Sequence, residues 1–410
     1  MRRAIAWTLV AAALLLAAAA VAVGWVFSER ILVPRPYGLM PEFELGEVVP
    51  AGDGTYEVEL PVPGEDPAQF ARTGVEGRYA LLWEGGSGEL GPVVREGEAT
   101  RTRTVRPTFG RPPRSGEPAR LDVFVFRPDP SARGLPYQEV RIAGPVGELP
   151  AWWLPGARTE AVLAFHGRRR ADRQELLRIL PTLTASGASV LVPSYRNHDE
   201  APPSRDGFYH YGGTEADDAL AAVRWLADRG VERIVLVGFS YGATVALGAL
   251  ERWPEAGPRP AGLVLDSPLL APVPVFEVGA RDLGLPLPGM LTRVAAAVAG
   301  WRSGEDYAAL DRRRMAPDLD LPVLLIAGTG DRTIPIELVD DFADALPRSP
   351  TYLRLDGVRH MEGWNVAPAR YEAEVRAFLD ELDLGAATRW PATAAIPSGR
   401  RDAPAEAAAR

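Results

Sequence analysis

A short apolar run followed by a longer helical stretch recurs from residue 138 to residue 382. Continuous β-branched runs such as Ile234-Val235-Leu236-Val237 are typical of parallel strands that are buried on both faces. Their alternation with helices predicts βαβ units and an α/β fold. The expected strands cover residues 161–165, 189–192, 234–237, 262–265, 323–326 and 351–355, after a hairpin at 139–142 and 148–153. The expected helices cover residues 172–186, 214–229, 243–250, 291–301, 337–346 and 369–382.

The chain before this domain has a different pattern. Residues 47–137 alternate short apolar runs with glycine and proline clusters and show no helical period, which predicts a small β-rich module. Its expected strands lie near 56–60, 79–83 and 121–126. Residues 29–46 contain several prolines and are expected to form an extended linker.

Two further segments interrupt or follow the α/β domain of residues 138–382. Prolines break the strand–helix rhythm at residues 267–316, which predicts a cap insertion that carries an apolar helix. Residues 383–410 are rich in Ala, Pro and Arg and are expected to be disordered. Thr214, with Asp217 three residues later, predicts a capping-box-like start for the second helix.

Residues 4–28 contain no charged side chain and follow Arg2 and Arg3. As a helix that rises about 1.5 Å per residue, this segment would cross a bilayer with some tilt, so we expect a transmembrane anchor. A cleaved signal peptide is the alternative, with Ala20-Val21-Ala22 as a small-residue cleavage site. Because amino-terminal arginines stay in the cytoplasm, both interpretations place the remaining chain outside it, on a single-pass cell-membrane anchor or secreted.

Composition narrows the classes of function. Hydrophobic residues make up 47% and charged residues 24% of the 410 residues, which allows a sizeable core. The net charge of −9 argues against a nucleic-acid surface, which needs a concentrated basic footprint. The chain has no cysteine, so disulfides, thiolate metal sites and a cysteine nucleophile are excluded.

The most informative motif is Gly238-Phe239-Ser240-Tyr241-Gly242. It lies between an apolar strand and a stretch that reads as a helix, and a Gly-x-Ser-x-Gly turn in that context predicts a nucleophile elbow. Such a turn holds the serine hydroxyl clear of the sheet edge. Gly238 and Gly242 are expected to let strand and helix approach closely. A structural turn bracketed by glycines is the alternative.

A serine nucleophile needs a base and an acid that orients the base. Of the four histidines, His360 follows the last strand, where a loop can bring it over the carboxyl edge of the sheet. Asp331 closely follows the preceding strand, and the chain order Ser240, Asp331, His360 is the one this architecture uses. Asp266 is the competing acid. A helix cap is the alternative role for Asp331, and the two roles can coexist.

The tetrahedral intermediate needs two hydrogen-bond donors for its oxyanion. We predict the backbone N–H of Tyr241, at the start of a helix, and the backbone N–H of Arg168, in the loop after the strand at 161–165. His166 is expected to be structural, hydrogen-bonded within that loop. It is also one of four residues that could shape the substrate pocket, namely His166, Tyr195, His198 and Tyr209.

A metal ion and an anionic group are two other ligands that this edge of the sheet could bind. His198 and His210 could bind a metal, but no ligand spacing recurs, so no metal and no cofactor are predicted. The Arg168-Arg169-Arg170 run could attract an anionic substrate or a lipid headgroup, and a solvated charge run is the alternative.

With these residues assembled, the chain from 138 to 382 resembles the α/β-hydrolase superfamily. The resemblance rests on His166-Gly167, the elbow, Gly330-Asp331 and Arg359-His360. Many members carry glycine where Arg359 stands, so the histidine loop departs from the family pattern. More narrowly, the chain looks like membrane-anchored serine aminopeptidase-like and monoacylglycerol lipase-like hydrolases. The resemblance implies an eight-stranded, mostly parallel sheet with helices on both faces, a Ser-His-Asp triad and no cofactor.

These observations predict a membrane-tethered serine hydrolase that works through an acyl-enzyme. A carboxylic ester is the expected substrate, either a small molecule or a lipid-derived ester, because tethering and an apolar cap favour amphipathic molecules. A peptidase or aminopeptidase of the same fold is the nearest alternative. A catalytically silent surface module that binds partners is the alternative from another class.

Overall fold

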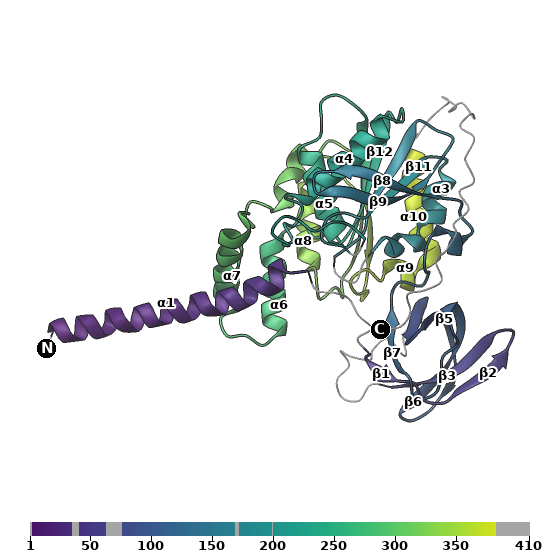
Figure 1. Cartoon of the computed structure of the whole chain (residues 1–410), viewed down its shortest axis with the longest axis horizontal. Helices are drawn as coiled ribbons and strands as arrows, with labels where there is room; N and C mark the ends of the chain where they lie inside the picture. The colour runs from purple at the N-terminus through teal and green to yellow at the C-terminus, as the bar shows by residue number, and fades with distance from the viewer. Residues whose placement is uncertain (1, 35–40, 63–75, 169–171, 199, 383–410) are drawn as a thin grey trace.

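A computed structural model describes residues 2–34, 41–62, 76–168, 172–198 and 200–382 of the chain. Part of the predicted linker at 29–46 and all of the predicted disordered tail at 383–410 lie outside the described residues. Figure 1 shows three parts in the described chain: a long amino-terminal helix, a β module and an α/β domain.

The α/β domain is built on an eight-stranded sheet with the order β15-β14-β13-β12-β10-β11-β9-β8. The six strands from β15 to β11 run parallel, β9 is antiparallel to β11, and β8 is antiparallel to β9. The sheet is therefore mostly parallel with a hairpin at one edge. Its strands are β8 (Gln138–Gly144), β9 (Gly147–Leu154), β10 (Glu160–Phe165), β11 (Ser189–Pro193), β12 (Arg233–Phe239), β13 (Arg259–Asp266), β14 (Val323–Gly328) and β15 (Thr351–Leu355).

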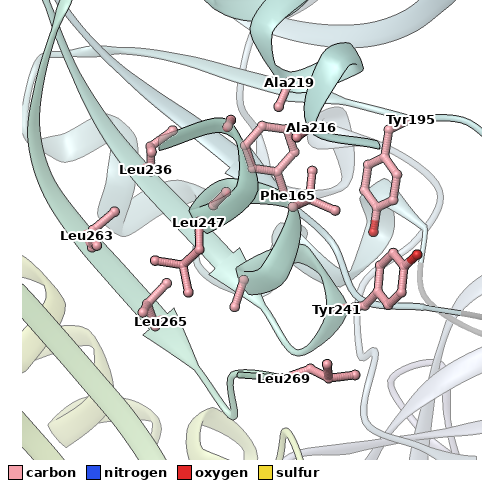
Figure 2. Close-up of a cluster of buried hydrophobic side chains, with 14 of the residues drawn as sticks. Phe165, Tyr195, Ala216, Ala219, Leu236, Tyr241, Leu247, Leu263, Leu265 and Leu269 are labelled. Carbon is pink, nitrogen blue, oxygen red and sulfur yellow. The ribbon is translucent and has the colours of Figure 1, made fainter. Parts of the chain in front are cut away.

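Alternate residues of the central strands fill two separate cores, one on each face of the sheet. Leu163 and Leu236 belong to the core under α4 (Glu215–Ala227), α5 (Tyr241–Glu251) and α8 (Ile336–Ala345). Part of this core is drawn in Figure 2. Val162 and Val237 belong to the other core, which packs under η2 (Arg173–Arg178), α3 (Leu180–Ala185) and α10 (Pro368–Glu381). The continuous apolar runs arise because these strands are covered on both faces.

Two helix predictions were wrong in detail. The helix expected at 172–186 is split into η2 and α3, because Pro181 lacks an N–H and fits only the first turn of a new helix. Thr214 precedes α4 but makes no side-chain capping hydrogen bond. Its φ of −77° and ψ of −25° are helical, whereas a capping side chain needs extended backbone. Asp217 instead pairs with Arg252 at 2.8 Å.

The β module is an antiparallel sheet with the order β1-β7-β4-β5-β6-β3-β2. It encloses its own small core, in which Val58, Tyr79, Leu81 and Leu121 are buried. The strand expected at 121–126 lies earlier, at Pro118–Asp122. Its strands are β1 (Phe43–Glu44), β2 (Val48–Gly52), β3 (Thr55–Pro61), β4 (Tyr79–Trp83), β5 (Gly86–Glu96), β6 (Thr100–Gly110) and β7 (Pro118–Asp122).

The amino-terminal helix α1 (Arg2–Leu32) is longer than the uncharged segment at 4–28 and continues through Glu29 and Arg30. Among the residues whose side chains are described, no helix has the length and apolar character that a membrane crossing requires. The predicted transmembrane segment therefore gains no support from the structure.

The cap insertion contains α6 (Pro272–Asp282) and α7 (Pro288–Ser303), and α1 lies beside α7 (Figure 1). Gly24 permits this contact, since a Cβ there would lie 2.8 Å from the Val294 side chain. Near the carboxyl end of α7, the guanidinium of Arg302 donates to the side chains of Ser28 and Glu29, both at 2.6 Å. The insertion predicted as a cap is thus packed against the amino-terminal helix.

Candidate active site

The turn between β12 and α5 has the geometry of a nucleophile elbow. Ser240 has φ 49° and ψ −110°, a conformation that costs a non-glycine residue about 1–3 kcal/mol. A Cβ on Gly238 would lie 2.4 Å from Cα of Ala243, and a Cβ on Gly242 would lie 2.3 Å from the carbonyl oxygen of Phe165. Both glycines are required because backbone passes where a side chain would begin.

The structure brings Ser240, His360 and Asp331 together at the carboxyl edge of the sheet. Nε2 of His360 lies 3.0 Å from Oγ of Ser240, and Nδ1 lies 2.6 Å from Oδ2 of Asp331. The Asp331 side chain is 2% exposed. This is the serine–base–acid chain expected from the sequence, with each pair within hydrogen-bond reach.

The second carboxylate oxygen of Asp331 has a structural role. Oδ1 accepts the amides of Thr333 and Ile334 at 2.7 and 2.8 Å, just before α8. The carboxylate therefore stabilises the turn into the helix while its other oxygen contacts the imidazole. The N-cap residue of α8 is Pro335, with no side-chain capping hydrogen bond, so the helix-cap role that the sequence left open for Asp331 is wrong in detail. Its Oδ1 holds the loop before the helix, while Oδ2 contacts His360.

Asp266, the competing acid, has other partners. Its carboxylate accepts from the hydroxyls of Tyr371 at 2.8 Å and Ser267 at 3.0 Å. Its backbone carbonyl accepts the Ser240 amide at 2.8 Å, which holds the elbow at the sheet edge. Burial raises the pKa of Asp266, and the charge of Arg178 opposes this shift. The geometry thus favours Asp331 over Asp266 as the partner of His360.

The electrostatics around His360 favour its protonated form. Burial alone would lower the pKa of this imidazole, but the charge of Asp331 and its hydrogen bond to Nδ1 outweigh burial. The pKa of His360 therefore lies above the ordinary histidine value. An imidazolium that forms after proton transfer from Ser240 would be stabilised by the same contact.

The two predicted oxyanion donors lie at the same edge of the sheet. Tyr241 is the first residue of α5, so its N–H has no partner within the helix. In the loop after β10, the N–H of Gly167 donates to Oε2 of Glu175 at 2.5 Å. Since that amide is occupied, the next one along, Arg168, is the better candidate for the second donor.

Glu175 was not identified from the sequence. It is 2% exposed, and burial raises its pKa to about 7 against the opposing charge of Arg178. Glu175 lies in η2 and belongs to no sequence motif. The sequence therefore contained no signal for it beyond the helix expected at 172–186. Its contact with Gly167 fixes the loop that carries Arg168.

The predicted pocket residues form a buried aromatic layer beside Tyr241. The ring of His166 stacks on Tyr195 and meets His198 edge-on, with centroids 4.6 Å apart in each pair. The Tyr209 ring lies 5.5 Å from that of Tyr241. Nδ1 of His166 lies 2.9 Å from the Gly167 carbonyl, so this histidine has the structural contact expected of it. All four side chains are almost completely buried, and none of them is among the residues that line the cavity between α1, α6 and α7.

His166, His198 and His210 have separate hydrogen-bond partners in the described structure. Burial lowers the pKa of His198 to about 4 and holds the pKa of His166 well below its ordinary value. His210 instead contacts two carboxylates, Glu305 at 3.0 Å and Asp206 at 3.1 Å. Burial opposes protonation there, but the Glu305 hydrogen bond and nearby acids raise the pKa of His210 to about 9. No cluster able to hold a metal occurs among the described residues.

The comparisons with known proteins match the α/β domain. The family model for the alpha/beta hydrolase fold matches residues 171–309. Uncharacterized proteins of Mycobacterium tuberculosis strains CDC 1551 / Oshkosh and H37Rv are each 32% identical over 221 residues, which cover 52% of this chain and 68% of theirs. A solved esterase structure from Pyrococcus furiosus is similar with a TM-score of 0.50 at 22% identity, covering 63% of this chain and 95% of that one.

The chain belongs to the alpha/beta hydrolase fold family. The family model covers the central part of the α/β domain, the two Mycobacterium tuberculosis relatives are similar over 68% of their length, and the P. furiosus structure supports the fold. The narrower resemblance to membrane-anchored, serine aminopeptidase-like members stays a prediction.

Proposed function

We propose that this protein is a serine hydrolase that cleaves carboxylic esters through an acyl-enzyme. The observation that carries the proposal is the continuous chain from Ser240 Oγ to His360 Nε2, at 3.0 Å, and from His360 Nδ1 to Asp331 Oδ2, at 2.6 Å. A serine hydroxyl is a weak nucleophile unless a base lies within hydrogen-bond reach. The elbow presents that hydroxyl at the end of β12 on strained backbone.

In this mechanism, His360 takes the Ser240 proton as Oγ attacks the ester carbonyl. The amides of Tyr241 and Arg168 stabilise the oxyanion, and His360 returns the proton to the leaving alcohol. Water, activated by the same imidazole, then attacks the acyl-enzyme and releases the acid. Asp331 keeps the tautomer of His360 that leaves Nε2 free to accept, and it offsets the imidazolium charge.

An ester is favoured over a peptide by the surface next to the site. A cavity there is lined mainly by apolar side chains of α1, α6 and α7. Its one carboxylate, Asp282, lies 3.7 Å from Arg332 and so is partly offset by that charge. Asp282 is the observation that keeps an aminopeptidase as the second candidate, because such an enzyme needs a carboxylate for the amino terminus of a peptide.

The experiment is hydrolysis of p-nitrophenyl acetate by the full chain with rapid mixing. An acyl-enzyme mechanism predicts p-nitrophenol release that is lost in Ser240→Ala and kept in Ser131→Ala. Ser131 is an exposed serine in the short 3-10 helix Pro130–Arg133, which lies between the two sheets in the chain. A parent that hydrolyses alanine p-nitroanilide faster than the ester would favour the peptidase. A folded parent with neither activity would favour the binding-module alternative.

Location is a separate question from chemistry. Membrane tethering through residues 4–28 stays a prediction and is not needed for the reaction proposed above. The extracytoplasmic location, predicted from Arg2, Arg3 and the uncharged segment after them, stays a prediction. Protease accessibility of the full chain in intact cells tests it.

A further inference from the structure

A cavity of about 500 Å³ lies between the end of α1 and the cap helices α6 and α7. This volume is in the range of small-molecule sites. Its walls include Phe27 and Ile31 from α1, Phe276 from α6 and Leu291 from α7. The segment predicted as an anchor thus contributes apolar side chains to an internal surface of the enzyme.

The end of α1 is hydrogen-bonded to the loops that surround the site. The carbonyl of Ile31 accepts from the Tyr211 hydroxyl at 3.0 Å and from the Arg168 guanidinium at 3.4 Å. The carbonyl of Leu32 accepts the Tyr209 amide at 2.8 Å. Carbonyls at a helix end have no partner inside the helix, so these contacts both cap α1 and fix it to the loop of the predicted oxyanion donor.

The same cavity reaches both loops that flank the serine. Arg168 lines it from the loop after β10, and Thr333 lines it from the loop after β14, two residues beyond Asp331. Ser240, Asp331 and His360 are not among the residues that line the cavity, so its connection to the site runs through these two loops. Burial of an apolar chain against the apolar walls would be favourable in proportion to the apolar area removed from water.

We propose that this cavity binds the aliphatic acyl chain of the ester and that α1 forms one of its walls. The proposal rests on the serine-hydrolase function above and adds the substrate class, esters of flexible fatty acids. It also gives the amino-terminal helix a role in chain-length specificity.

Two substitutions change the cavity in opposite directions. Phe27→Ala enlarges it from the α1 side. Gly279→Phe fills it from α6, where a Cβ would meet no atom within 4 Å and the backbone needs no glycine conformation. Val26→Ala is the matched control, since Val26 is 62% exposed on the same turn of α1 and does not line the cavity.

The measurement is kcat/KM of the full chain on p-nitrophenyl acetate, butyrate, octanoate and laurate. We expect a parent preference for an acyl chain longer than acetyl. Gly279→Phe should lower kcat/KM for the longest accepted chain at least 10-fold more than for acetate, whereas Phe27→Ala should shift the optimum to longer chains. Ser240-dependent acetate hydrolysis with no chain-length shift in either variant overturns the cavity assignment alone. Loss of all ester hydrolysis in the parent contradicts the proposed function itself.

A second, independent set of contacts links the β module to the histidine loop. The hydroxyl of Tyr79, in β4, donates to Oε2 of Glu362 at 3.0 Å. The amide of Arg78 donates to the Asn365 carbonyl at 2.8 Å, and Nδ2 of Asn365 donates to the Arg78 carbonyl at 2.6 Å. These partners lie two and five residues after His360, in and beside the short helix α9 (Gly363–Val366).

The α/β domain holds the same segment from its other side. Nη1 of Arg178 donates to the carbonyl of Met361 at 2.9 Å and to Oδ1 of Asn365 at 3.2 Å. Met361 directly follows His360 and has φ 63°, an unfavourable conformation that surrounding contacts must hold. Gly77 allows the module to approach, since a Cβ there would lie 2.7 Å from the Asn365 carbonyl oxygen.

We infer that the β module positions His360 by clamping the segment after it between Arg178 and β4. This role also rests on the proposed hydrolase function. Tyr79 and Asn365 are positioning residues, because they act on the imidazole through the backbone of the loop.

The test compares Tyr79→Phe and Asn365→Ala with Tyr56→Phe in the full chain. Tyr56 lies in β3 of the same module, and its hydroxyl has no hydrogen bond within the described residues. A displaced imidazole should lower kcat about 10- to 100-fold in the first two variants, with KM within twofold, since catalysis depends steeply on the placement of reacting groups. Glu362→Gln, which can still accept from Tyr79, should retain most of the activity.

A purely structural role would give a different result. It would lower the melting temperature and leave kcat per folded molecule within twofold of the parent in both clamp variants, and that outcome overturns the inference. Equal loss of kcat in Tyr56→Phe would also contradict it, because the effect would then belong to the module as a whole.

Discussion

Nδ1 of His360 lies 2.6 Å from Oδ2 of Asp331, while Oδ1 of the same carboxylate accepts two backbone amides. The acid is thereby held by the turn into α8 before it meets the imidazole. Its orientation is fixed by backbone and does not depend on the histidine loop. His360 must keep one tautomer in order to act as the base. An acid that is already oriented, as Asp331 is, meets that requirement.

Asp331→Asn should abolish most activity with little change in fold. The amide can still accept from Thr333, but its NH₂ group would face Nδ1 and favour the wrong tautomer of His360. We expect kcat to fall about 10³- to 10⁴-fold, with KM nearly unchanged. Asp356→Asn is the matched control, since Asp356 accepts from Thr329 on the same edge of the sheet. Full activity in Asp331→Asn would exclude Asp331 as the orienting acid.

The pH dependence of kcat/KM should report the raised pKa of His360. Only the neutral imidazole can accept the serine proton, so activity should rise with pH through a pKa above the ordinary value of about 6.5. A pH–rate profile of the free enzyme measures it. An acidic limb centred below that value would show that Asp331 does not stabilise the imidazolium.

His210 should make stability depend on pH in the mildly basic range. Its pKa is about 9 in the folded protein and about 6.5 in the unfolded chain, so protonation favours the folded state. This contribution, of order 2 kcal/mol, is fully present below pH 6.5 and is lost as pH rises through 9. Urea unfolding of the parent and His210→Asn at pH 6 and pH 10 should show a difference between them only at pH 6.

Gly242→Ala should damage the elbow. The new methyl group would overlap the carbonyl oxygens of Phe165 and His166, at 2.3 and 2.5 Å, and backbone cannot move aside as a side chain can. We expect a loss of at least about 2 kcal/mol of stability, together with a loss of activity, as for other overpacked core sites. Gly279→Ala is the control for stability, because it adds the same methyl group at a helical glycine where no atom lies within 4 Å of the new Cβ. A variant as stable as the parent would show that strand and helix are less closely packed at Gly242.

The central part of the site could be predicted from sequence because its signals are local. Ser240 is marked by its flanking strand and glycines, and Asp331 and His360 by their places after consecutive strands. Glu175 could not be found, because it acts through a fold-dependent approach to Gly167 and belongs to no motif. The end of α1 was read as part of a membrane segment and linker, since nothing local shows that the Ile31 carbonyl meets Tyr211.

The β module illustrates the same limit. Its strands were visible in the alternation of residues, but Tyr79 contacts Glu362 across 283 positions of the chain. Contacts of that kind depend on how the two sheets are placed relative to each other. The predicted N-cap at Thr214 was wrong for the opposite reason. The local motif was favourable, but the backbone of Thr214 is already helical and its side chain makes no capping hydrogen bond.

The most direct test of the account is to treat the full chain with a fluorophosphonate and map the adduct by peptide mass spectrometry. The account predicts one adduct, on Ser240, that is lost in Ser240→Ala and strongly slowed in His360→Ala, because the hydroxyl needs its base. Absence of an adduct on the folded parent, or an adduct on another serine, would contradict the claim that Ser240 is an activated nucleophile.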